Sequence, residues 1–451
     1  MSAPLDLLVI GAGACGLAGA IAAHDAGLSV AIVEKRDRPG GNSALSTGSI
    51  PGAGTRYQRA AGIDDSPARM EADLRALAGP HDADDLTRLT AQGCGPLCEW
   101  LIEDLGVRME LITAYRHIGH SVERLHAPRS RRGADLVEDL LRCVADRDIP
   151  LAPGNAVSDL LIEGGAVTGA MVNGEAVAAR KVLLATNGFA ADPGLVRAHL
   201  PGIAGIDYYG APGSTGEAIR WGESLGAALG NMGAWQGYAA VVWPQGQLLS
   251  WTTIEKGGIL IGGDGGRFGA EDAGYSGFAS LVRAQPGPVW AVLDARIHAI
   301  ALQEEEYAEM ARMGALRWAD TPEALAEALG LDPCPLLSAV ADYNAAAVGT
   351  APDPFGRRDF GMAPLVPPLA AVSVRPGLFH TQGGLLVDGH ARVRRASGGI
   401  VPNLFAGGGA AAGISGRAGA GGYASGNGLV TALLLGRIAG ERAAVELQGA
   451  A

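Results

Sequence analysis

Two hydroxyl-bearing residues stand in a segment near the end of the chain that is otherwise almost bare of side chains. The segment reads GAGGYASGNGL over residues 419–429, and its hydroxyls belong to Tyr423 and Ser425. Glycine-rich backbone lets a bound ligand come close to the main chain. A phenol and an alcohol can donate hydrogen bonds to a carbonyl oxygen or relay a proton. The segment therefore predicts a ligand site with uncharged polar groups.

A dinucleotide-binding pattern opens the chain. The apolar run LLVI predicts a buried strand over residues 7–10, and Gly11, Gly13 and Gly16 follow it as G-x-G-x-x-G. The first glycine permits a tight turn, the second lets a pyrophosphate approach the backbone, and the third lets the next helix pack on the strand. A second predicted strand, residues 30–33, ends at Glu34, whose carboxylate can bind ribose hydroxyls.

Several later segments carry a family resemblance. The stretch EKRDRPGGNSALSTGSIPGAG after the second strand places a short loop over residues 40–46, where an NAD site would have another strand and helix. This layout resembles the FAD-binding family of fumarate reductases, succinate dehydrogenase flavoproteins and ketosteroid dehydrogenases. KVLLATNGF, GSTGEAIRWGESLGAAL and PNLFAGGGAAAG resemble further segments of that family, so the likeness covers most of the chain.

The resemblance implies FAD as cofactor and departs from the family at two positions. Asn187 stands where the family usually has glycine, and Gly408 stands where many members place an acid on the ribityl chain. No histidine lies within residues 40–55, where covalent members attach the flavin, so non-covalent FAD is expected. Besides the three glycines and Glu34, the cofactor contacts implied are Ala14, Lys35, Gly41, Asn42, Ser43, Ser46, Thr47, Gly48, Thr186, Asn187, Gly188, Gly407, Gly408, Ser425, Gly426, Asn427, Gly428 and Leu429.

The resemblance also implies the organisation of the chain. The expected fold class is α/β, with a Rossmann-like, glutathione-reductase-like FAD domain made from residues 1–236 and 381–451 and an inserted α+β cap domain over residues 237–380. The active site is expected between cap and flavin. From the residues alone, 155–186 predict a β-meander, because short apolar runs alternate with glycine turns. Residues 300–348 predict helices, with Thr321 as an N-cap.

Three motifs are expected to meet at the substrate. GGRFGAEDAGY resembles the family's G-x-R-F-x-N-E motif, and Tyr275 stands where a fumarate reductase has a proton-delivering arginine and ketosteroid dehydrogenases have tyrosine. Tyr238 matches a histidine that holds a substrate carboxylate in fumarate reductases. FHTQGG keeps the family's H-x-x-G-G as His380, Gly383 and Gly384. Function for His380 is only slightly preferred over a structural role, and Tyr238 is interpreted as a pocket wall.

The segment that opened this section resembles the G-Y-x-S-G-x-x-L run of 3-ketosteroid Δ4-dehydrogenases, which implies active-site roles for Tyr423 and Ser425. Fumarate reductases have a carboxylate-binding arginine two residues before the paired glycines. Gly419 stands there in this chain, and Arg417 lies nearby but out of register. The pattern favours a neutral carbonyl over a carboxylate beside the flavin.

The predicted function is therefore an FAD-dependent desaturase of a saturated cyclic ketone, such as a 3-oxosteroid or 4-oxocyclohexanecarboxylate. Hydride transfer to flavin N5 accompanies loss of an α-proton, which hydrogen bonds to the enolate oxygen make feasible. Tyr275 is the predicted base, with Tyr423 and Ser425 polarising the carbonyl or relaying the proton. The alternatives are a fumarate-type reductase of a C4 dicarboxylate or enoate, with Arg417 as clamp, and a flavin subunit that serves an iron–sulfur partner.

Two arrays of basic and imidazole side chains remain. His117, His120 and His126 lie in a segment that resembles a loop of the family. Contact with substrate is one alternative for them, and orientation of loops is the preferred interpretation. Arg129, Arg131 and Arg132 are interpreted as a solvated run, with binding of a substrate carboxylate as the minority alternative.

Composition limits the partners. A net charge of −12 over 451 residues disfavours nucleic acid. Five cysteines without paired CxxC spacing predict neither a disulfide framework nor a metal site. Neither a leader segment nor an apolar run of about 18 residues is recognised, so a cytoplasmic enzyme without stable membrane insertion is expected. The electron acceptor, whether O2, a quinone or a redox protein, is left open.

Overall fold

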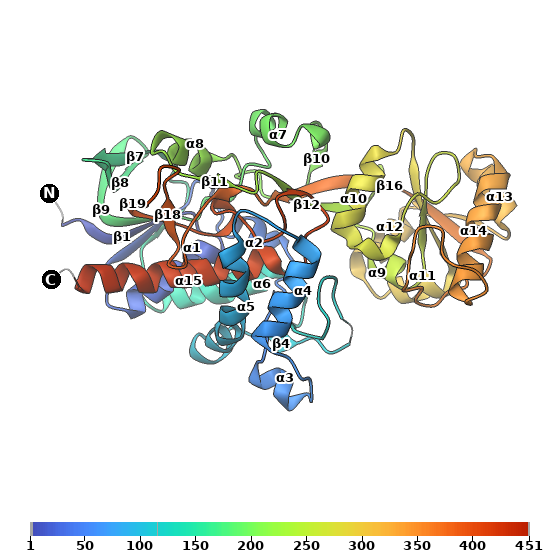
Figure 1. Ribbon diagram of the computed structural model, residues 1–451, viewed down its shortest axis with the longest axis horizontal. Helices are drawn as coiled ribbons and strands as arrows, with labels where there is room; N and C mark the ends of the chain where they lie inside the picture. Colours follow the sequence, from blue (N-terminus) through green and yellow to red (C-terminus); the bar gives the residue numbers. More distant parts are fainter. Residues whose placement is uncertain (1–2, 115, 450–451) are drawn as a thin grey trace. The chain divides into compact units, whose positions relative to one another are not determined.

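The computed structural model describes residues 3–114 and 116–449. Residue contacts divide the chain into two compact units, the first made of Met1–Trp235 with His380–Ala451 and the second of Gln236–Phe379 (Figure 1). The first is called the FAD unit below and the second the inserted unit. Strands β12 (Gly233–Val242) and β16 (Leu369–Thr381) carry the chain into and out of the inserted unit.

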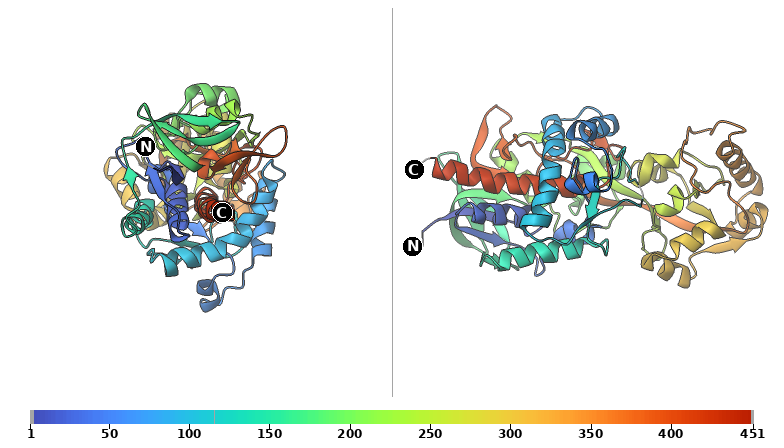
Figure 2. Two further views of the ribbon diagram at one scale, coloured as in Figure 1. Left: turned by 90° about the vertical axis from the view of Figure 1, so that its left-hand side faces the viewer. Right: turned by 90° about the horizontal axis from the view of Figure 1, so that it is seen from below.

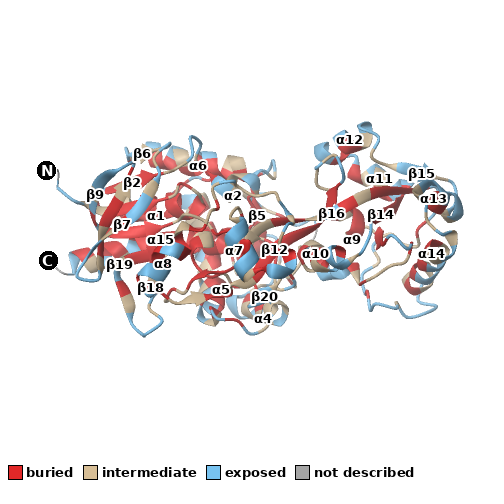
Figure 3. Cartoon of the chain, turned by 90° about the horizontal axis from the view of Figure 1, so that it is seen from above, coloured by how far each residue is buried: buried red, intermediate tan, exposed pale blue. Residues whose placement is uncertain are grey.

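A mostly parallel sheet forms the centre of the FAD unit. Its strands lie in the order β18 (Arg392–Arg394), β19 (Ile400–Ala406), β9 (Glu175–Leu184), β1 (Leu5–Ile10), β2 (Val30–Val33) and β6 (Leu151–Ala152). All neighbours are parallel except β18 with β19. Leu7, Leu8 and Val9 are 0% exposed, as expected of a strand covered on both faces. Figure 3 colours the buried residues of the chain red. The predicted second strand is confirmed at its predicted bounds, and the first lies within β1.

Two helices pack on each other through glycines. In α15 (Asn427–Gln448), a Cβ on Gly436 would lie 2.1 Å from the Cys15 carbonyl oxygen of α1 (Ala14–Asp25), and one on Gly440 would lie 2.3 Å from that of Gly19. Position 15 therefore lies level with 436, and 19 with 440, so the helices run side by side in the same direction (Figure 2). At 1.5 Å per residue, α15 begins roughly 12 Å, eight residues, ahead of α1.

Two further regions test predictions of local secondary structure. Strands β7 (Val157–Glu163), β8 (Ala166–Val172) and β9 pair antiparallel, which confirms the predicted meander. The loop expected over residues 40–46 instead forms the short helix α2 (Gly41–Leu45), because the amide of Ala44 reaches the carbonyl of Gly40 at 3.3 Å. The region still contains no further strand, as the resemblance implied.

The remaining elements of the FAD unit connect these layers. They are β3 (Ile50–Pro51), α3 (Arg56–Ala60), α4 (Pro67–Ala78), α5 (Asp84–Glu99), a π-helix (Trp100–Asp104), β4 (Glu110–Leu111), β5 (Leu125–Ala127), α6 (Gly133–Ala145), α7 (Pro193–His199), the 3₁₀ turn Pro201–Ile203, β10 (Asp207–Tyr208), α8 (Glu217–Ser224), β11 (Leu229–Gly230), β17 (Gly384–Leu385), the 3₁₀ turn Gly408–Ala410 and β20 (Ala418–Gly419).

The inserted unit combines an antiparallel sheet with short helices. Its sheet contains β13 (Ile259–Ile261), β14 (Val289–Asp294), β15 (Arg317–Ala319), and parts of β12 and β16, and its helices are α9 (Thr252–Glu255), α10 (Gly274–Ala284), α11 (Ala295–Ala301), α12 (Glu305–Arg312), α13 (Pro322–Leu329) and α14 (Pro333–Ala347). The predicted N-cap is confirmed, since Thr321 Oγ1 accepts from the Ala324 amide at 3.2 Å. Strand β15 interrupts the helices expected over 300–348.

A buried ionic cluster holds the segment that leads into α10. Glu271 is 0% exposed, and its Oε2 lies 2.6 Å from Arg267 Nη2 and 3.2 Å from Arg357 Nη1. Arg267 Nη1 also lies 2.6 Å from Asp353 Oδ2. Each buried charge therefore has an opposite partner, which is the condition for keeping charges in an interior. The R-F-x-x-E motif thus has a structural explanation at this i,i+4 pair.

No helix in residues 3–114 or 116–449 combines the length and the apolar character that a membrane crossing needs.

Substitution of Gly436 by alanine should destabilise the FAD unit. The new methyl group would lie 2.1 Å from the Cys15 carbonyl oxygen, so α15 must shift away from α1. We expect a loss of about 1–3 kcal/mol, beyond the helix-propensity gain of up to about 1 kcal/mol. Thermal unfolding of the holoprotein measures it. Gly202→Ala is the control, because nothing lies within 4 Å of its Cβ. Equal melting temperatures would contradict the packing argument.

The Glu255 carboxyl group should make stability depend on pH. Burial raises its pKa from 4.5 to about 7, which Lys256 opposes and Asp359 and Glu304 reinforce. Because the folded-state pKa is the higher one, the contribution is full below about pH 4.5 and is lost as the pH rises to about 7. Relative to Glu255→Gln, wild-type stability should fall over this range by at most about 3 kcal/mol.

Urea unfolding at pH 4.5, 6, 7 and 8 checks this expectation. Replacement of the exposed Glu306 by glutamine is the control and should leave the pH dependence of the wild type unchanged. Parallel stability curves for the wild type and Glu255→Gln would show that the buried carboxyl group does not titrate as described.

Candidate active site

The glycine turn after β1 leaves no room for side chains. Gly11 has φ +107°, and a Cβ there would lie 2.4 Å from the Ala185 carbonyl oxygen. A Cβ on Gly16 would lie 1.9 Å from the Gly11 carbonyl oxygen. Gly13 is the N-cap of α1, and the Ala14 amide donates to Ser43 Oγ at 3.1 Å. The backbone at the start of α1 is therefore open to close approach by a phosphate group.

The two charged residues after β2 are placed differently. Glu34 accepts from the Ala12 amide through Oε2 at 2.9 Å and from the Arg36 amide through Oε1 at 2.9 Å. These bonds hold the carboxylate beside the glycine turn, where a ribose is expected. Lys35 Nζ instead donates to Thr215 Oγ1 at 2.8 Å and to Glu217 Oε1 at 2.6 Å. Lys35 therefore ties β2 to the start of α8.

The polar side chains around α2 mostly bond to their own loop. Ser46 Oγ donates to the Ser43 carbonyl at 2.7 Å and accepts from the Gly48 amide at 3.0 Å. Thr47 Oγ1 donates to Ser49 Oγ at 2.9 Å. Asn42 Oδ1 accepts from the Ala211 amide at 2.6 Å, and Gly41 has φ +51°. These bonds fix the loop next to the start of α1.

The turn after β9 explains the departure at Asn187. Its φ is +67°, a left-handed conformation that glycine and asparagine tolerate best. Its side chain donates to Ser214 Oγ at 2.8 Å and accepts from the Gly188 amide at 2.8 Å. A Cβ on Gly188 would lie 2.2 Å from Thr381 Oγ1. Asn187 thus stabilises the turn that glycine usually makes in the family.

The segment around the 3₁₀ turn at Gly408 packs on α1. A Cβ on Gly407 would lie 2.6 Å from Cys15 Sγ, and Gly408 has φ +59° with Cys15 as its nearest neighbour. No carboxylate stands at position 408 to bind a ribityl chain. At this position only backbone groups of the turn are present to bind a ribityl chain.

The residues expected around FAD pass a simple test of fit. Thr186 Oγ1 and Asn427 Oδ1 are buried and have no hydrogen-bond partner in the described part of the chain. Buried polar atoms normally have partners. Gly426, with φ +82°, caps α15, and Leu429 in its first turn is 8% exposed. A polar cofactor along these segments would supply the missing bonds.

His380 and Tyr423 lie next to each other beside Gly428. Their ring centroids lie 5.5 Å apart in an edge-on arrangement. A Cβ on Gly428 would lie 3.3 Å from His380 Nε2 and 3.7 Å from Tyr423 Oη, so both side chains come close to this glycine. Burial lowers the pKa of His380 to about 4. The imidazole is therefore uncharged at neutral pH.

Gln382 was not foreseen from the sequence, although it lies in the same FHTQGG motif. Its Nε2 lies 3.0 Å from His380 Nδ1, and the Thr381 carbonyl lies 3.3 Å from the same nitrogen. Both groups lie at Nδ1, and only one of them can bond to it in a given tautomer of the neutral ring, since the Gln382 amide donates and the carbonyl accepts. The other ring nitrogen, Nε2, lies toward Gly428. Gln382 follows His380 by two residues, and side chains two positions apart in an extended segment lie on the same face. This spacing was the signal that could have predicted the contact.

A buried network holds the segment that carries Ser425. His120 Nε2 donates to the Ser425 carbonyl at 2.8 Å, and Arg124 Nη1 lies 3.4 Å from His120 Nδ1. Since a carbonyl only accepts and a guanidinium only donates, the His120 proton is on Nε2. Burial lowers the pKa of His120 to about 3, so this tautomer is neutral. Its predicted role as a loop-orienting residue is confirmed.

Arg124 is fully buried and paired with two acids. Its Nη2 lies 3.0 Å from Asp65 Oδ1 and its Nη1 lies 2.9 Å from Asp73 Oδ2. The charge that faces His120 is therefore neutralised from the other side. His126 belongs to the same region, with Nε2 3.2 Å from Thr55 Oγ1, and burial lowers its pKa to about 4.

The inserted unit contains a stack of three aromatic rings. Tyr238 lies between Tyr275 and Phe379, with centroid distances of 5.3 Å and 5.4 Å and interplanar angles of 29° and 8°. The Tyr238 hydroxyl donates to the Leu249 carbonyl at 2.9 Å and accepts from the Trp251 amide at 3.0 Å. Burial raises the Tyr238 pKa far above its ordinary value. Its hydroxyl is thus engaged with backbone, and its ring supports Tyr275.

Phe379 was also missed by sequence reasoning, although it directly precedes His380. The alternation of β16 gives these two neighbours different roles, since Phe379 belongs to the aromatic stack and His380 lies beside Tyr423. The available signal was an aromatic residue directly before the H-x-x-G-G motif.

The residues predicted to bind substrate outside these groups are otherwise engaged. A Cβ on Gly383 would lie 2.6 Å from Met232 Cα, so this position serves close packing. The Arg417 side chain is 64% exposed, and its Nε and Nη2 each lie 2.8 Å from Asp82 Oδ1. Arg417 thus forms a surface ion pair.

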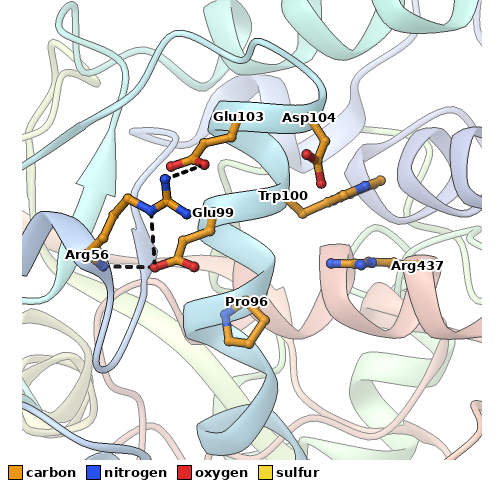
Figure 4. A pocket seen from close by; sticks show the side chains of 7 residues that line it. All are labelled: Arg56, Pro96, Glu99, Trp100, Glu103, Asp104 and Arg437. Carbon is orange, nitrogen blue, oxygen red and sulfur yellow. Dashed lines mark hydrogen bonds and ion pairs between the residues drawn. The ribbon is translucent and has the colours of Figure 1, made fainter.

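A separate open hollow of about 240 Å³ lies where α5 and the π-helix meet α15 (Figure 4). Arg56 pairs there with Glu103 at 2.6 Å and lies near Glu99 at 3.9 Å. Arg437 stacks 4.6 Å from the Trp100 ring and pairs with Glu441 at 2.8 Å. Both cations of this hollow already have partners, and none of the predicted site residues line it.

Comparison with known proteins places the chain in a family. Residues 6–429 match the family described as FAD binding domain. NADH:fumarate oxidoreductase of Klebsiella pneumoniae (strain 342) is 31% identical over 98% of this chain and 48% of its own length. A probable fumarate reductase of Shewanella frigidimarina (strain NCIMB 400) is 28% identical over 97% of this chain and 74% of its own. The chain thus spans about half of the first relative and three quarters of the second.

Relatives with a different activity also match. 4-Oxocyclohexanecarboxylate 2-dehydrogenase of Sinomonas cyclohexanicum is 26% identical over 89% of this chain and 86% of its own length. Among solved structures, 3-ketosteroid Δ4-(5α)-dehydrogenase from Rhodococcus jostii RHA1, in complex with 4-androstene-3,17-dione, has a TM-score of 0.81 at 27% identity, covering 98% of this chain and 97% of that one. The fold and the FAD cofactor expected from the sequence are thereby confirmed.

These matches extend over most or nearly all of the chain. The chain belongs to the FAD-binding flavoprotein family of fumarate reductases and 3-ketosteroid dehydrogenases, and it is an FAD-dependent oxidoreductase that acts on CH–CH bonds.

Proposed function

We propose that this oxidoreductase desaturates a saturated cyclic ketone, with a 3-oxosteroid or a smaller ring such as 4-oxocyclohexanecarboxylate as the candidate substrate. One observation carries the proposal. The phenol of Tyr423 and the neutral imidazole of His380 lie next to each other beside Gly428. Uncharged donors suit the oxygen of a ketone, whereas a carboxylate is best bound by cations.

The residues would hold FAD along two helix starts. The start of α1, with Gly11, Gly13 and Glu34, suits the pyrophosphate and ribose. The start of α15 lies roughly 12 Å ahead of the start of α1 along the helix axes and suits the isoalloxazine end. Thr186 and Asn427 have the buried polar atoms that a cofactor would satisfy. Attachment is non-covalent in this proposal. FAD supplies a hydride acceptor at N5 when it is bound.

The chain's own groups handle the oxygen and the proton. Tyr423 and Ser425 donate to the ketone oxygen or relay the proton, and His380 holds the position of the ring beside them. Tyr275 is the proposed base. An unperturbed phenol, with a pKa of about 10, is mostly protonated at neutral pH. A phenol of this kind acts as a base through a relay to a second hydroxyl group.

A fumarate-type reductase of a C4 dicarboxylate or enoate is the second candidate. The names of the relatives favour it over the desaturase, since the Klebsiella and Shewanella proteins are both named for fumarate. As a carboxylate clamp, Arg417 would have to leave Asp82 and its exposed position. The electron partner, whether O2, a quinone, a redox protein or an iron–sulfur subunit, and the cytoplasmic location stay predictions.

Anaerobic flavin spectra separate the two candidates. Oxidised holoprotein mixed with cyclohexanones or 3-oxosteroids should lose its flavin absorbance if a ketone is desaturated. Dithionite-reduced holoprotein should be reoxidised by the matching enone and not by fumarate. Reoxidation by fumarate, together with no bleaching by any ketone, would reject the desaturase in favour of the reductase.

Loss of either catalytic phenol should slow flavin reduction without loss of FAD. We expect Tyr275→Phe and Tyr423→Phe each to lower the rate by about 10²–10⁴, the usual contribution of proton transfer by a positioned group. Stopped-flow absorbance with a ketone found active measures it. Tyr57→Phe is the control, because Tyr57 bonds to Glu103 on the surface. An unchanged rate in Tyr275→Phe would remove this residue from the mechanism.

A further inference from the structure

Arg131 has an unusual backbone conformation and a buried guanidinium nitrogen. Its φ is +57°, a left-handed conformation that is costly for a side chain of this size. Its amide donates to the Pro128 carbonyl at 2.9 Å, which closes the turn. The side chain is partly buried, and Nη1 is buried without a hydrogen-bond partner among the residues described. This turn therefore places one nitrogen of the guanidinium in the interior.

One side of this turn touches the loop expected at the flavin. The Gly133 amide donates to the Ser46 carbonyl at 2.6 Å. A Cβ on Gly48 would lie 2.9 Å from Pro128 Cδ, so the backbones of the two loops are in contact. Both Ser46 and Gly48 belong to the predicted cofactor residues. Arg131 thus stands next to the FAD cradle.

The other side faces the loop that carries Ser425. His117 lies close enough to Arg131 for the arginine charge to act on it, since burial first and that charge second lower the His117 pKa to about 4. The next residue, Ile118, accepts from the Ser425 amide at 3.0 Å. Arg131 is therefore in the neighbourhood of the proposed substrate groups.

The charged residues closest to Arg131 in the sequence are exposed or bonded elsewhere. Arg129 and Arg132 are exposed, and the acid in the same turn, Asp135, accepts from Ser130 Oγ at 2.5 Å. A buried guanidinium keeps its charge, and an unpaired N–H in an interior costs free energy. A ligand carboxylate would repay that cost with a charge-assisted hydrogen bond.

We propose that Arg131 binds a carboxylate of the substrate, remote from the carbonyl that Tyr423 and Ser425 face. The substrate class is thereby an oxo acid, a molecule with a ketone at one end and a carboxylate at the other. This inference rests on the proposed function for the ketone end. It selects small ring oxo acids over neutral steroids.

Binding of unreactive probes tests the proposal without turnover. Cyclohexanecarboxylate and its methyl ester are titrated against holoprotein, and the flavin difference spectrum reports the dissociation constant. In Arg131→Gln we expect the constant for the carboxylate to rise about tenfold or more, and that for the ester to stay within about twofold. Arg129→Gln, a change at an exposed arginine two residues away, is the matched control and should bind both probes as the wild type does.

Arg131→Lys guards against a mere folding defect, because it keeps the charge and should retain part of the carboxylate affinity. Equal losses for carboxylate and ester, unchanged carboxylate binding in Arg131→Gln, or no carboxylate binding to the wild type would each overturn the role of Arg131. If carboxylate binding depends on Arg131 but no ketone bleaches the flavin, the proposed desaturase fails and the carboxylate site stands.

Discussion

The close packing of α1 on α15 is the constraint on which the rest of the FAD unit depends. At Gly436 and Gly440 the backbone of α15 reaches the carbonyl oxygens of α1 with no side chain between them. This contact fixes how far one helix start lies ahead of the other. A dinucleotide needs one end held at its phosphates and the other at its reactive ring. The glycines of α15 therefore set the spacing between the two helix starts along which FAD is proposed to bind.

The groups around Gly428 and Ser425 show how an interior keeps imidazoles uncharged. Burial lowers the pKa of both His380 and His120 well below neutral. His120 then acts as a fixed donor to a backbone carbonyl, while the charge of Arg124 behind it is balanced by two acids. In this region the charge of Arg124 is paired within the protein, and both imidazoles are uncharged at neutral pH.

Sequence reasoning was most successful where a signal is local. The strand Val30–Val33, the glycine turn after β1 and the Thr321 cap depend on neighbours within a few residues, and all three agree with the structure. Strand β15 was missed because it is three residues long and lies among strongly helical segments, and its pairing with β16 joins residues about 50 positions apart.

The partners of long side chains could not be predicted in the same way. Lys35 pairs with Glu217 and Arg417 with Asp82, across 182 and 335 positions of sequence. Motif spacing predicts which residue occupies a position of the site, but it does not predict where that side chain points. The left-handed φ of Arg131 could not be predicted either, because arginine has no preference for this conformation.

Two of the buried polar atoms that have no hydrogen-bond partner among the described residues, Thr186 Oγ1 and Asn427 Oδ1, have a consequence for the stability of the folded chain. Each unsatisfied group of this kind costs about 1–3 kcal/mol. A cofactor that satisfies them binds the native state and not the unfolded one, so each tenfold rise in its free concentration above the dissociation constant adds about 1.4 kcal/mol to stability. The free flavin concentration in a cell would thereby affect the fraction of the chain that is unfolded.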